Sequence, residues 1–444
     1  MSIIISVILL LSLAIFGRGG FQQIPVNQSD VYFSSKIFAN HAAVNLPWNF
    51  LHSVLRKDFN TNNPYTFMAD NKAKSLVDSL YNNKPSSFSE SILNTKKPNI
   101  IFIILESYTS KFIGCLGGQK GVTPNIDKIA AEGMLFNNIY ASGDRSEKGL
   151  VALLSGYPTQ TVTSIVKTPT KTEKLPQLST TLKKQGYNTS YYYGGELAFA
   201  NIKSYLLNGS YDRLISKGDF DSKFYNSKWG VHDDVLLKRF LSDLNKEKRP
   251  FFANLFTLSS HEPYKVPFEK HFAGDDETSL FKNSFAYTDQ AIGAFITQAK
   301  QQSWWDSTLI IMVADHGHRL PYFDANDNPE KFKIPLLFSG GALKQKGVVI
   351  NTIGSQTDIG YTLLRQLNIE NSGWKWSKDL LDLKANQFAF YIFNDGFGIV
   401  TPKGAVTFDN VAKKEIYRSG KIDSSQLLSG KAYMQQSFKD FLRR

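Results

Sequence analysis

The sequence predicts an α/β protein with a mostly parallel central sheet and helices on both faces. Three runs of apolar residues are typical of strands that are buried on both faces, at 100–105, 253–257 and 309–314. Helical segments separate these runs, and strands that alternate with helices favour a parallel sheet covered on both sides. The predicted helices span 125–133, 178–186, 233–244 and 287–301.

The composition indicates a large folded protein. With 444 residues, the chain is long enough for one large α/β domain with smaller additions, or for about three average domains. Its 33 Phe, 20 Tyr and 6 Trp exclude intrinsic disorder, which requires few aromatic residues. The single cysteine, Cys115, excludes an intramolecular disulfide framework and a metal site built from several cysteines.

The charge balance indicates an anionic partner. The chain has 51 basic and 39 acidic residues, a net charge of +12. Such a surface attracts nucleic acid, anionic lipid headgroups or phosphate-rich polymers. The sequence has no zinc finger, no aromatic strand typical of RNA-binding domains and no basic heptads. We therefore expect a membrane face or a phosphorylated substrate, and no nucleic acid.

The amino-terminal segment is apolar. Residues 3–16 include only Ser6 and Ser12 as polar residues, and a Gly-Arg-Gly-Gly stretch follows at 17–20. A membrane-spanning helix needs about 20 apolar residues, so this run is short. It lacks the basic start and the cleavage site of a signal peptide, and a buried helix is unexpected at a terminus. We expect residues 1–18 to be a membrane segment, either alone or as the last of several.

The next part of the chain has no clear periodicity. Residues 19–95 contain only short amphipathic stretches, at 42–55 and 73–80, but are too apolar for an unpacked tether. We expect a linker that packs on the catalytic domain. That domain is expected to cover 96–380, where the texture changes to alternating strands and helices.

A small antiparallel subdomain is expected at 381–444. Short apolar strands at 388–393, 397–401 and 405–408 are joined by tight turns, the first of them Asn-Asp-Gly. A closing helix is expected at 424–442.

Two predicted strands end in residues that can bind metal ions. The first strand runs directly into Glu106, and another ends in Asp315, His316, Gly317 and His318. A carboxylate at one strand end has an ordinary explanation, as a helix cap or a surface group. Two such ends, one with two histidines, favour a divalent cation such as Zn²⁺ or Mn²⁺. Gly317 permits a turn that directs both preceding side chains inward.

Ser146 is a candidate nucleophile. It lies in a Gly-Asp-Arg-Ser-Glu-Lys-Gly stretch at 143–149, ahead of an apolar run at 150–154. A hydroxyl just inside a helix start lies where backbone N–H groups and the helix dipole favour negative charge. A bound metal would lower its pKa and favour an alkoxide. The spacing agrees equally well with a plain helix-capping serine.

His261 follows another apolar strand and could donate a proton to a leaving group or hold a phosphate oxygen. A structural role is equally consistent with its position. The remaining histidines show no partner pattern: His41, His52, His232 and His271.

Taken together and in order, these motifs resemble the alkaline phosphatase and sulfatase superfamily, and within it the lipoteichoic acid synthase-like branch. The resemblance covers about 96–380, and the leader is similar to the end of the family's membrane region. It implies an alkaline phosphatase-like sandwich. The motifs lie at 99–108, 123–127, 131–133, 229–234, 260–264, 315–317 and 355–359.

The resemblance also implies a site. Glu106, Ser146, Asp315 and His316 would bind one divalent cation, Mn²⁺ or Zn²⁺ with Mg²⁺ as a further candidate. Ser146 would double as the nucleophile, where synthases of this branch usually have Thr. His261 would bind the phosphoryl group or assist the leaving group. The implied substrate-binding residues are His318, Arg145, Lys148 and Arg319.

One feature departs from true sulfatases. These enzymes convert Cys or Ser to formylglycine within a Cys/Ser-x-Pro-x-Arg context. Here Ser146 is followed by Glu-Lys-Gly and Cys115 by Leu-Gly. A sulfatase label would therefore describe the fold and not the reaction.

The function implied by the resemblance is metal-dependent phosphoglycerol transfer from a phospholipid headgroup, through a phosphoserine intermediate. It implies an anionic phospholipid or glycan substrate, and a location at the cell membrane with the catalytic domain outside or in the periplasm. Alternatives within the superfamily are phosphoethanolamine transfer and hydrolysis by a phosphatase or phosphodiesterase. A catalytically silent envelope binding protein is disfavoured by the complete set of ligand-type residues.

Overall fold

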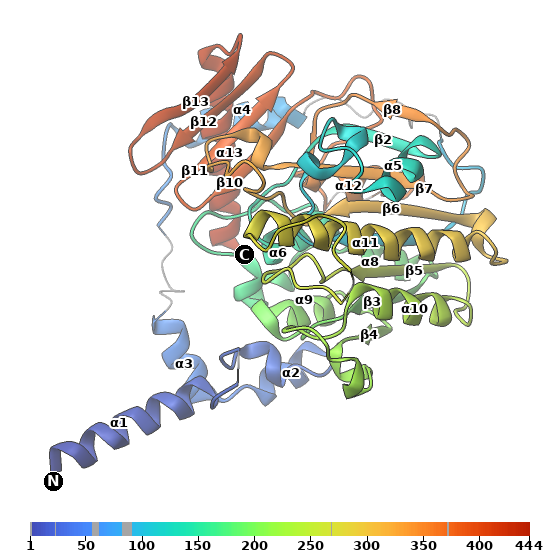
Figure 1. The fold of residues 1–444 in the computed structure, drawn as a ribbon. Coiled ribbons are helices and arrows are strands. Elements are labelled where there is room, and N and C mark those ends of the chain that lie inside the picture. Colours follow the sequence, from blue (N-terminus) through green and yellow to red (C-terminus); the bar gives the residue numbers. More distant parts are fainter. Residues whose placement is uncertain (1, 23, 56–61, 82–90, 268, 371–372) are drawn as a thin grey trace.

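A computed structural model describes residues 2–22, 24–55, 62–81, 91–267, 269–370 and 373–444. It confirms the predicted fold class: a large central sheet with helices around it, and a separate four-stranded antiparallel sheet (Figure 1). The sheet forms the centre of the main hydrophobic core.

The central sheet has the strand order β4-β3-β5-β1-β6-β7-β2-β8, and β9 pairs with β2. The three predicted strands correspond to β5, β1 and β6, which are adjacent, parallel and fully buried. Only β7 runs antiparallel to both neighbours. The strands are β1 (Asn99–Leu105), β2 (Met134–Tyr140), β3 (Asn188–Tyr193), β4 (Arg213–Ile215), β5 (Phe251–Phe256), β6 (Thr308–Ala314), β7 (Lys333–Ser339), β8 (Val348–Ile350) and β9 (Gly354–Ser355).

Helices cover both faces of this sheet (Figure 1). The predicted helix at 287–301 begins earlier, at Glu277, because the Asp276 carboxylate accepts hydrogen bonds from the N–H groups of Thr278 and Ser279. The helices are α5 (Pro124–Ala131), α6 (Ser146–Ser155), α7 (Pro169–Thr172), α8 (Leu178–Lys184), α9 (Ile202–Asn208), α10 (Asp233–Leu244), α11 (Glu277–Ala299) and α12 (Gln356–Gln366).

The C-terminal strands form an antiparallel meander against α13 (Ser424–Arg443), and this helix packs against α4 (Asp70–Tyr81). Gln435 of α13 accepts hydrogen bonds from the backbone of Phe67 and Met68. The predicted linker therefore contacts the C-terminal helix here, although its parts at 56–61 and 82–90 lie outside the described residues. The strands are β10 (Ala389–Phe393), β11 (Gly396–Thr401), β12 (Gly404–Asp409) and β13 (Lys414–Gly420).

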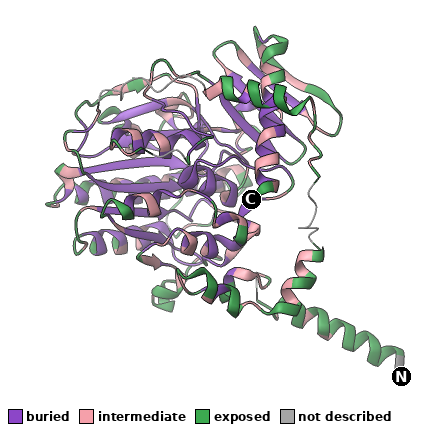
Figure 2. Cartoon of the chain, turned by 180° about the vertical axis from the view of Figure 1, so that it is seen from behind, coloured by how far each residue is buried: buried purple, intermediate pink, exposed green. Residues whose placement is uncertain are grey.

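Helices α1 (Ser2–Arg18) and α3 (Leu46–Leu55) lie apart from the main body, whereas α2 (Ile37–Ala43) lies against its underside (Figure 1), where His41 is 2.9 Å from Glu173. They are mostly exposed, in contrast to the buried sheet (Figure 2). In the described parts of the chain, no helix has both the length and the apolar character required to cross a membrane.

Candidate active site

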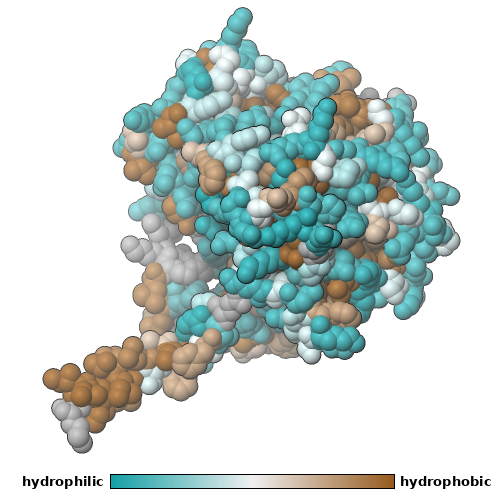
Figure 3. Space-filling view, in the orientation of Figure 1, coloured by the Kyte–Doolittle hydropathy of each residue, from teal (hydrophilic) through white to brown (hydrophobic). Residues whose placement is uncertain are grey.

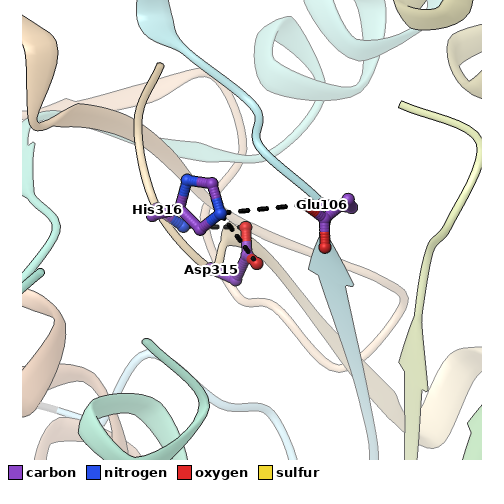
Figure 4. Close-up of side chains that lie close together, drawn as sticks. All are labelled: Glu106, Asp315 and His316. Atoms are coloured by element: carbon purple, nitrogen blue, oxygen red, sulfur yellow. Dashed lines mark hydrogen bonds and ion pairs between the residues drawn. The ribbon is translucent and has the colours of Figure 1, made fainter. Parts of the chain in front are cut away.

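Three of the predicted metal ligands lie together at one edge of the central sheet (Figure 4). Glu106 follows β1, while Asp315 and His316 follow β6; the two strands are parallel neighbours, so their carboxyl ends meet. The ligand atoms lie within 4.8 Å of one another. His316 Nε2 is 3.7 Å from Glu106 Oε1 and 3.5 Å from Asp315 Oδ2. All three residues are buried.

The turn after β1 ties the two carboxylates together. The Ser107 N–H donates to Asp315 Oδ1 at 2.8 Å, and the Ser107 hydroxyl donates to Glu106 Oε1 at 2.7 Å. Ser107 has a φ of 57°, in the left-handed region, which costs a residue other than glycine about 1 kcal/mol or more. A role for Ser107 was not evident from the sequence, because strain of this kind depends on the tertiary turn.

Residues after β5 hold Glu106 from the other side. The Glu106 N–H donates to Thr257 Oγ1 at 2.8 Å, and the Ser260 hydroxyl donates to the Glu106 carbonyl at 2.6 Å. The position of this carboxylate is thus fixed by three neighbouring strands.

The charges of the cluster are unbalanced. Burial, reinforced by Asp315, raises the pKa of Glu106 to about 8. Burial lowers the pKa of His316, but Asp315 and Glu106 outweigh it and leave this pKa above its usual value. Asp315 Oδ2 is buried and has no hydrogen-bond partner among the described residues. A bound cation would compensate a buried carboxylate oxygen in this state.

The donor set fits a divalent metal ion. His316 Nδ1 donates to the Gly317 carbonyl at 2.8 Å, so in the neutral ring Nε2 is the nitrogen that has the lone pair, and this nitrogen lies beside the two carboxylates. Two carboxylates and one imidazole are ligands that Zn²⁺ and Mn²⁺ accept. Gly317 is required here, because a Cβ would lie 2.0 Å from the Lys331 carbonyl oxygen.

Ser146 reaches the same cluster from the opposite side. It is the first residue of α6, and its hydroxyl donates to Glu106 Oε2 at 3.2 Å and lies 3.5 Å from His316 Nε2. Gly149 allows this approach, because a Cβ there would lie 1.8 Å from the Asp315 carbonyl oxygen. The structure therefore brings all four predicted metal ligands together.

Gln356, at the start of α12, connects the two sides of the site. Its Nε2 donates to the carbonyls of Ala314 and Asp315 at 2.8 and 2.5 Å, while its Oε1 accepts from the Ser142 N–H at 2.9 Å. We had no role for Gln356 from the sequence, although it lies within one of the family-like motifs.

The predicted substrate-binding cations differ in their availability. Lys148 is buried and donates to Asp144 and to the Thr161 carbonyl, both at 3.1 Å. Arg319 donates to both oxygens of Glu277 at 2.7 Å. Arg145 is exposed and has no carboxylate within ion-pair distance among the described residues. Of these three, Arg145 is the one without an ion pair among the described residues.

The two predicted histidines outside the metal cluster have different surroundings. His318 packs on Phe281 with the ring centroids 4.3 Å apart, and Leu320 N–H donates to its Nδ1. Burial, reinforced by nearby cations, lowers the pKa of His318 to about 3, so it is neutral. His261 is half-buried, lies edge-on to Trp229, and donates from Nδ1 to the Glu262 carbonyl at 3.0 Å.

Asp233 positions the loop that carries His261. This buried carboxylate accepts hydrogen bonds from the backbone of Leu258 and Ser259 and from the Thr288 hydroxyl. The loop after β5 is therefore fixed to α10 and α11.

A cavity of about 300 Å³ opens beside His261. Lys217 and Lys228 line it and lie over aromatic rings, with no carboxylate within ion-pair distance among the described residues. Two carboxylates, Asp30 and Glu196, also line the cavity, so it presents both cations and anions beside aromatic surface. The lining residues are Gln22, Ile24, Asp30, Tyr193, Glu196, Ala198, Phe199, Lys217, Lys228, Trp229 and His261.

Comparisons with known proteins agree with this architecture. The profile of the sulfatase family matches residues 98–369. The chain is 22% identical to a lipoteichoic acid synthase-like protein of Bacillus subtilis over 322 residues, 66% of this chain and 51% of that protein. It is 27% identical to phosphoglycerol transferase I of Xanthomonas campestris over 292 residues, 61% and 41% of the two chains. The chain spans about half the length of the curated relatives it matches.

Solved structures show the same fold. An alkaline phosphatase superfamily protein from Vibrio parahaemolyticus superposes with a TM-score of 0.74 at 27% identity, over 85% of this chain and 97% of that one. A lipoteichoic acid synthase from Listeria monocytogenes gives 0.68 at 17% identity, over 85% and 99%. Because the family profile covers more than half of its residues, this chain belongs to the sulfatase family, with the fold of the alkaline phosphatase superfamily.

Proposed function

We propose that this chain is a metal-dependent phosphotransferase that moves a phosphoglycerol group from a phospholipid headgroup through a covalent phosphoserine at Ser146. The observation that carries the proposal is the Ser146 hydroxyl, 3.2 Å from the buried Glu106 carboxylate at the start of α6. Relatives named lipoteichoic acid synthase and phosphoglycerol transferase support this substrate class.

Glu106, Asp315, His316 and Ser146 would together hold one divalent cation, Mn²⁺ or Zn²⁺. When bound, it supplies charge neutralisation on the phosphorus oxygens and a lowered hydroxyl pKa. The unpartnered Asp315 Oδ2 supports the assignment of this site.

The protein residues account for the remaining steps. Ser146 Oγ forms a bond to phosphorus and passes its proton to Glu106, to which it already donates a hydrogen bond. The bond from phosphorus to the diacylglycerol oxygen breaks, and His261 delivers a proton to that leaving oxygen. The N–H groups at the start of α6 face the phosphoryl charge. An acceptor hydroxyl on a glycan or lipid then gives its proton to His261 and attacks phosphorus, the bond from phosphorus to Ser146 Oγ breaks, and Glu106 returns the proton to Ser146. Arg145 and the lysines beside His261 hold the anionic headgroup.

The proposed location follows from the substrate. A phospholipid donor requires a catalytic domain at the membrane surface, and we propose that it faces the outside or the periplasm, in agreement with the named activity of the relatives. The chain has none of the residues that true sulfatases need around their modified cysteine or serine, so sulfate ester hydrolysis is not proposed.

Substitution of the nucleophile tests the proposal. Ser146→Ala should reduce turnover of a fluorescent phosphatidylglycerol by on the order of 10⁴, because no covalent intermediate can form. The matched control Ser146→Thr keeps a hydroxyl at the same place and should retain activity. Product analysis separates transfer from hydrolysis, since water as acceptor releases free glycerol phosphate. An active Ser146→Ala enzyme would refute the mechanism.

A further inference from the structure

Helix α3 has its polar side toward the protein and its apolar side toward solvent. Asn49, His52 and Ser53 are the partly buried polar residues of this helix, and Asn49 accepts a hydrogen bond from Gln28. On the outer side, Leu46 is 77% and Leu55 82% exposed. A helix on the surface of a water-soluble domain has the opposite arrangement.

Helix α2 and its surroundings show the same inversion. The Asn40 side chain is fully buried, where it accepts from the N–H groups of Phe33 and Ser34. Phe38, two residues earlier in the same helix, is 84% exposed. The exposed apolar side chains of this region, here named the apolar collar, are Phe21, Phe33, Phe38, Leu46, Phe50, Leu51, Val54 and Leu55.

The collar is continuous with α1. The Trp48 indole of α3 donates a hydrogen bond to the Gly17 carbonyl near the end of α1, at 3.2 Å. The side chains of α1 are apolar and exposed on all sides, and the hydrophobic surface extends from α1 onto α3 in Figure 3. Trp at such a junction is typical of the boundary between lipid and water.

We propose that the apolar collar rests in the interface of a lipid bilayer, with α2 and α3 as interfacial helices. Eight large apolar side chains exceed what a monomeric protein normally presents in one region. Helices α2 and α3 contain no acidic residue, Asp30 is the acidic residue of the segment between α1 and α2, and Lys36 and Arg18 flank the collar within a chain of net charge +12. This combination matches an anionic lipid surface, to which apolar burial and cation attraction contribute together.

The collar would also place the catalytic cleft. The segment after α1 contributes Gln22, Ile24 and Asp30 to the wall of the cavity that contains His261. Asn27 within it donates to the Ala198 carbonyl at 2.9 Å, which fixes this segment to the catalytic domain. If the function proposed above holds, a collar seated in lipid brings the cavity to the height of the headgroups.

Depth measurements on a nitroxide label test the collar directly. In a Cys115→Ser background, Val54→Cys on α3 is labelled, with Leu383→Cys as the matched control, since Leu383 is 94% exposed on the C-terminal side of the molecule. The full chain is reconstituted into vesicles of equal parts phosphatidylglycerol and phosphatidylcholine. We expect the ratio of oxygen to nickel-chelate accessibility to rise several-fold at 54 and to stay at its aqueous value at 383.

Two results would overturn the proposal. An aqueous ratio at position 54 in vesicles would place α3 in water. The second result concerns the label in detergent solution without lipid. If it is inaccessible to the nickel chelate there, and shows spin–spin broadening that disappears on dilution with unlabelled chain, the collar is a contact between two copies of the chain.

A charge substitution gives an independent measurement. Phe50→Glu with Leu55→Glu should lower the vesicle partition coefficient by about tenfold. Leu383→Glu with Val411→Glu, at two exposed sites outside the collar, should leave it unchanged. Equal partition for both variants would contradict the proposal, and thermal unfolding checks that each is folded. Neither experiment uses turnover, so its outcome is independent of Ser146.

Discussion

The floor and the rim of the proposed site are built differently. The floor, Glu106, Ser146, Asp315 and His316, is held by hydrogen bonds from strands β1, β5 and β6 and by α6. The rim, Arg145 and the cavity beside His261, consists mostly of residues outside the helices and strands of the central sheet, with Tyr193 of β3 as the exception. A rigid floor suits bond making, which depends on sub-ångström placement, whereas an open rim suits the selection of a substrate.

The sharpest test of this contrast removes one charge from the floor. Asp315→Asn keeps the shape of the side chain but removes the charge of the unpartnered Oδ2. We expect bound metal to fall to background in elemental analysis and turnover to fall by on the order of 10³. Full metal content in this variant would show that the floor is not the metal site.

A second test moves the floor without changing its chemistry. Gly149→Ala places a Cβ 1.8 Å from the Asp315 carbonyl, so α6 must shift and carry Ser146 away. We expect kcat to fall by about 10² and unfolding to become easier by about 1–3 kcal/mol. Gly218→Ala is the control, because a Cβ there meets nothing within 4 Å. Equal activity of the two variants would show that catalysis does not depend on the close approach of α6 to the Asp315 backbone.

A third test concerns proton delivery from the rim. His261→Gln should lower kcat by on the order of 10² while metal content and thermal stability stay unchanged, because the residue does not contact the metal cluster. A more acidic leaving group should restore much of the rate, which a merely structural role would not allow. His271→Gln, at another exposed histidine, controls for general effects.

The smallest effect is expected on KM, and it distinguishes the two exposed arginines, Arg145 and Arg319. Arg145→Gln should raise KM about fivefold with little change in kcat, as an exposed ionic contact contributes up to about 1 kcal/mol. Arg319→Gln should leave KM unchanged, since Glu277 already occupies that guanidinium. If only Arg319→Gln raises KM, then Arg319 and not Arg145 contacts the substrate.

Much of the fold was predictable because local patterns coincide with tertiary roles. The three strands β5, β1 and β6 are apolar along their whole length, as required of central strands, and their predicted positions agree with the structure. The other strands of the central sheet, β2, β3, β4, β7, β8 and β9, were not predicted, and neither was β13. Strand β3 is a run of Asn, Thr, Ser and three Tyr. The hydroxyls of Thr189 and Tyr192 donate to Asp212 and Asp243, whereas those of Ser190 and Tyr191 have no hydrogen-bond partner among the described residues.

The candidate site likewise has residues that could be predicted from the sequence and residues that could not. The candidate metal ligands were predicted from two strand ends and a serine, and they lie together because residues that follow adjacent parallel strands meet at one edge of the sheet. The roles of Ser107 and Gln356 could not be found this way. Each joins segments more than 200 residues apart, and neither has a local pattern that differs from an ordinary turn or helix start.

By itself, then, the sequence determined which strands lie at the centre, which side chains have metal-binding chemistry, and that a hydroxyl begins a helix nearby. The tertiary structure alone decided which cations remain available, since Lys148 and Arg319 pair with carboxylates and Arg145 has no such partner in the part of the chain that the structure describes. It also decided which side of α3 faces outward. The reason is physical: periodicity and residue type are encoded locally, whereas pairing and burial depend on what the rest of the chain brings alongside.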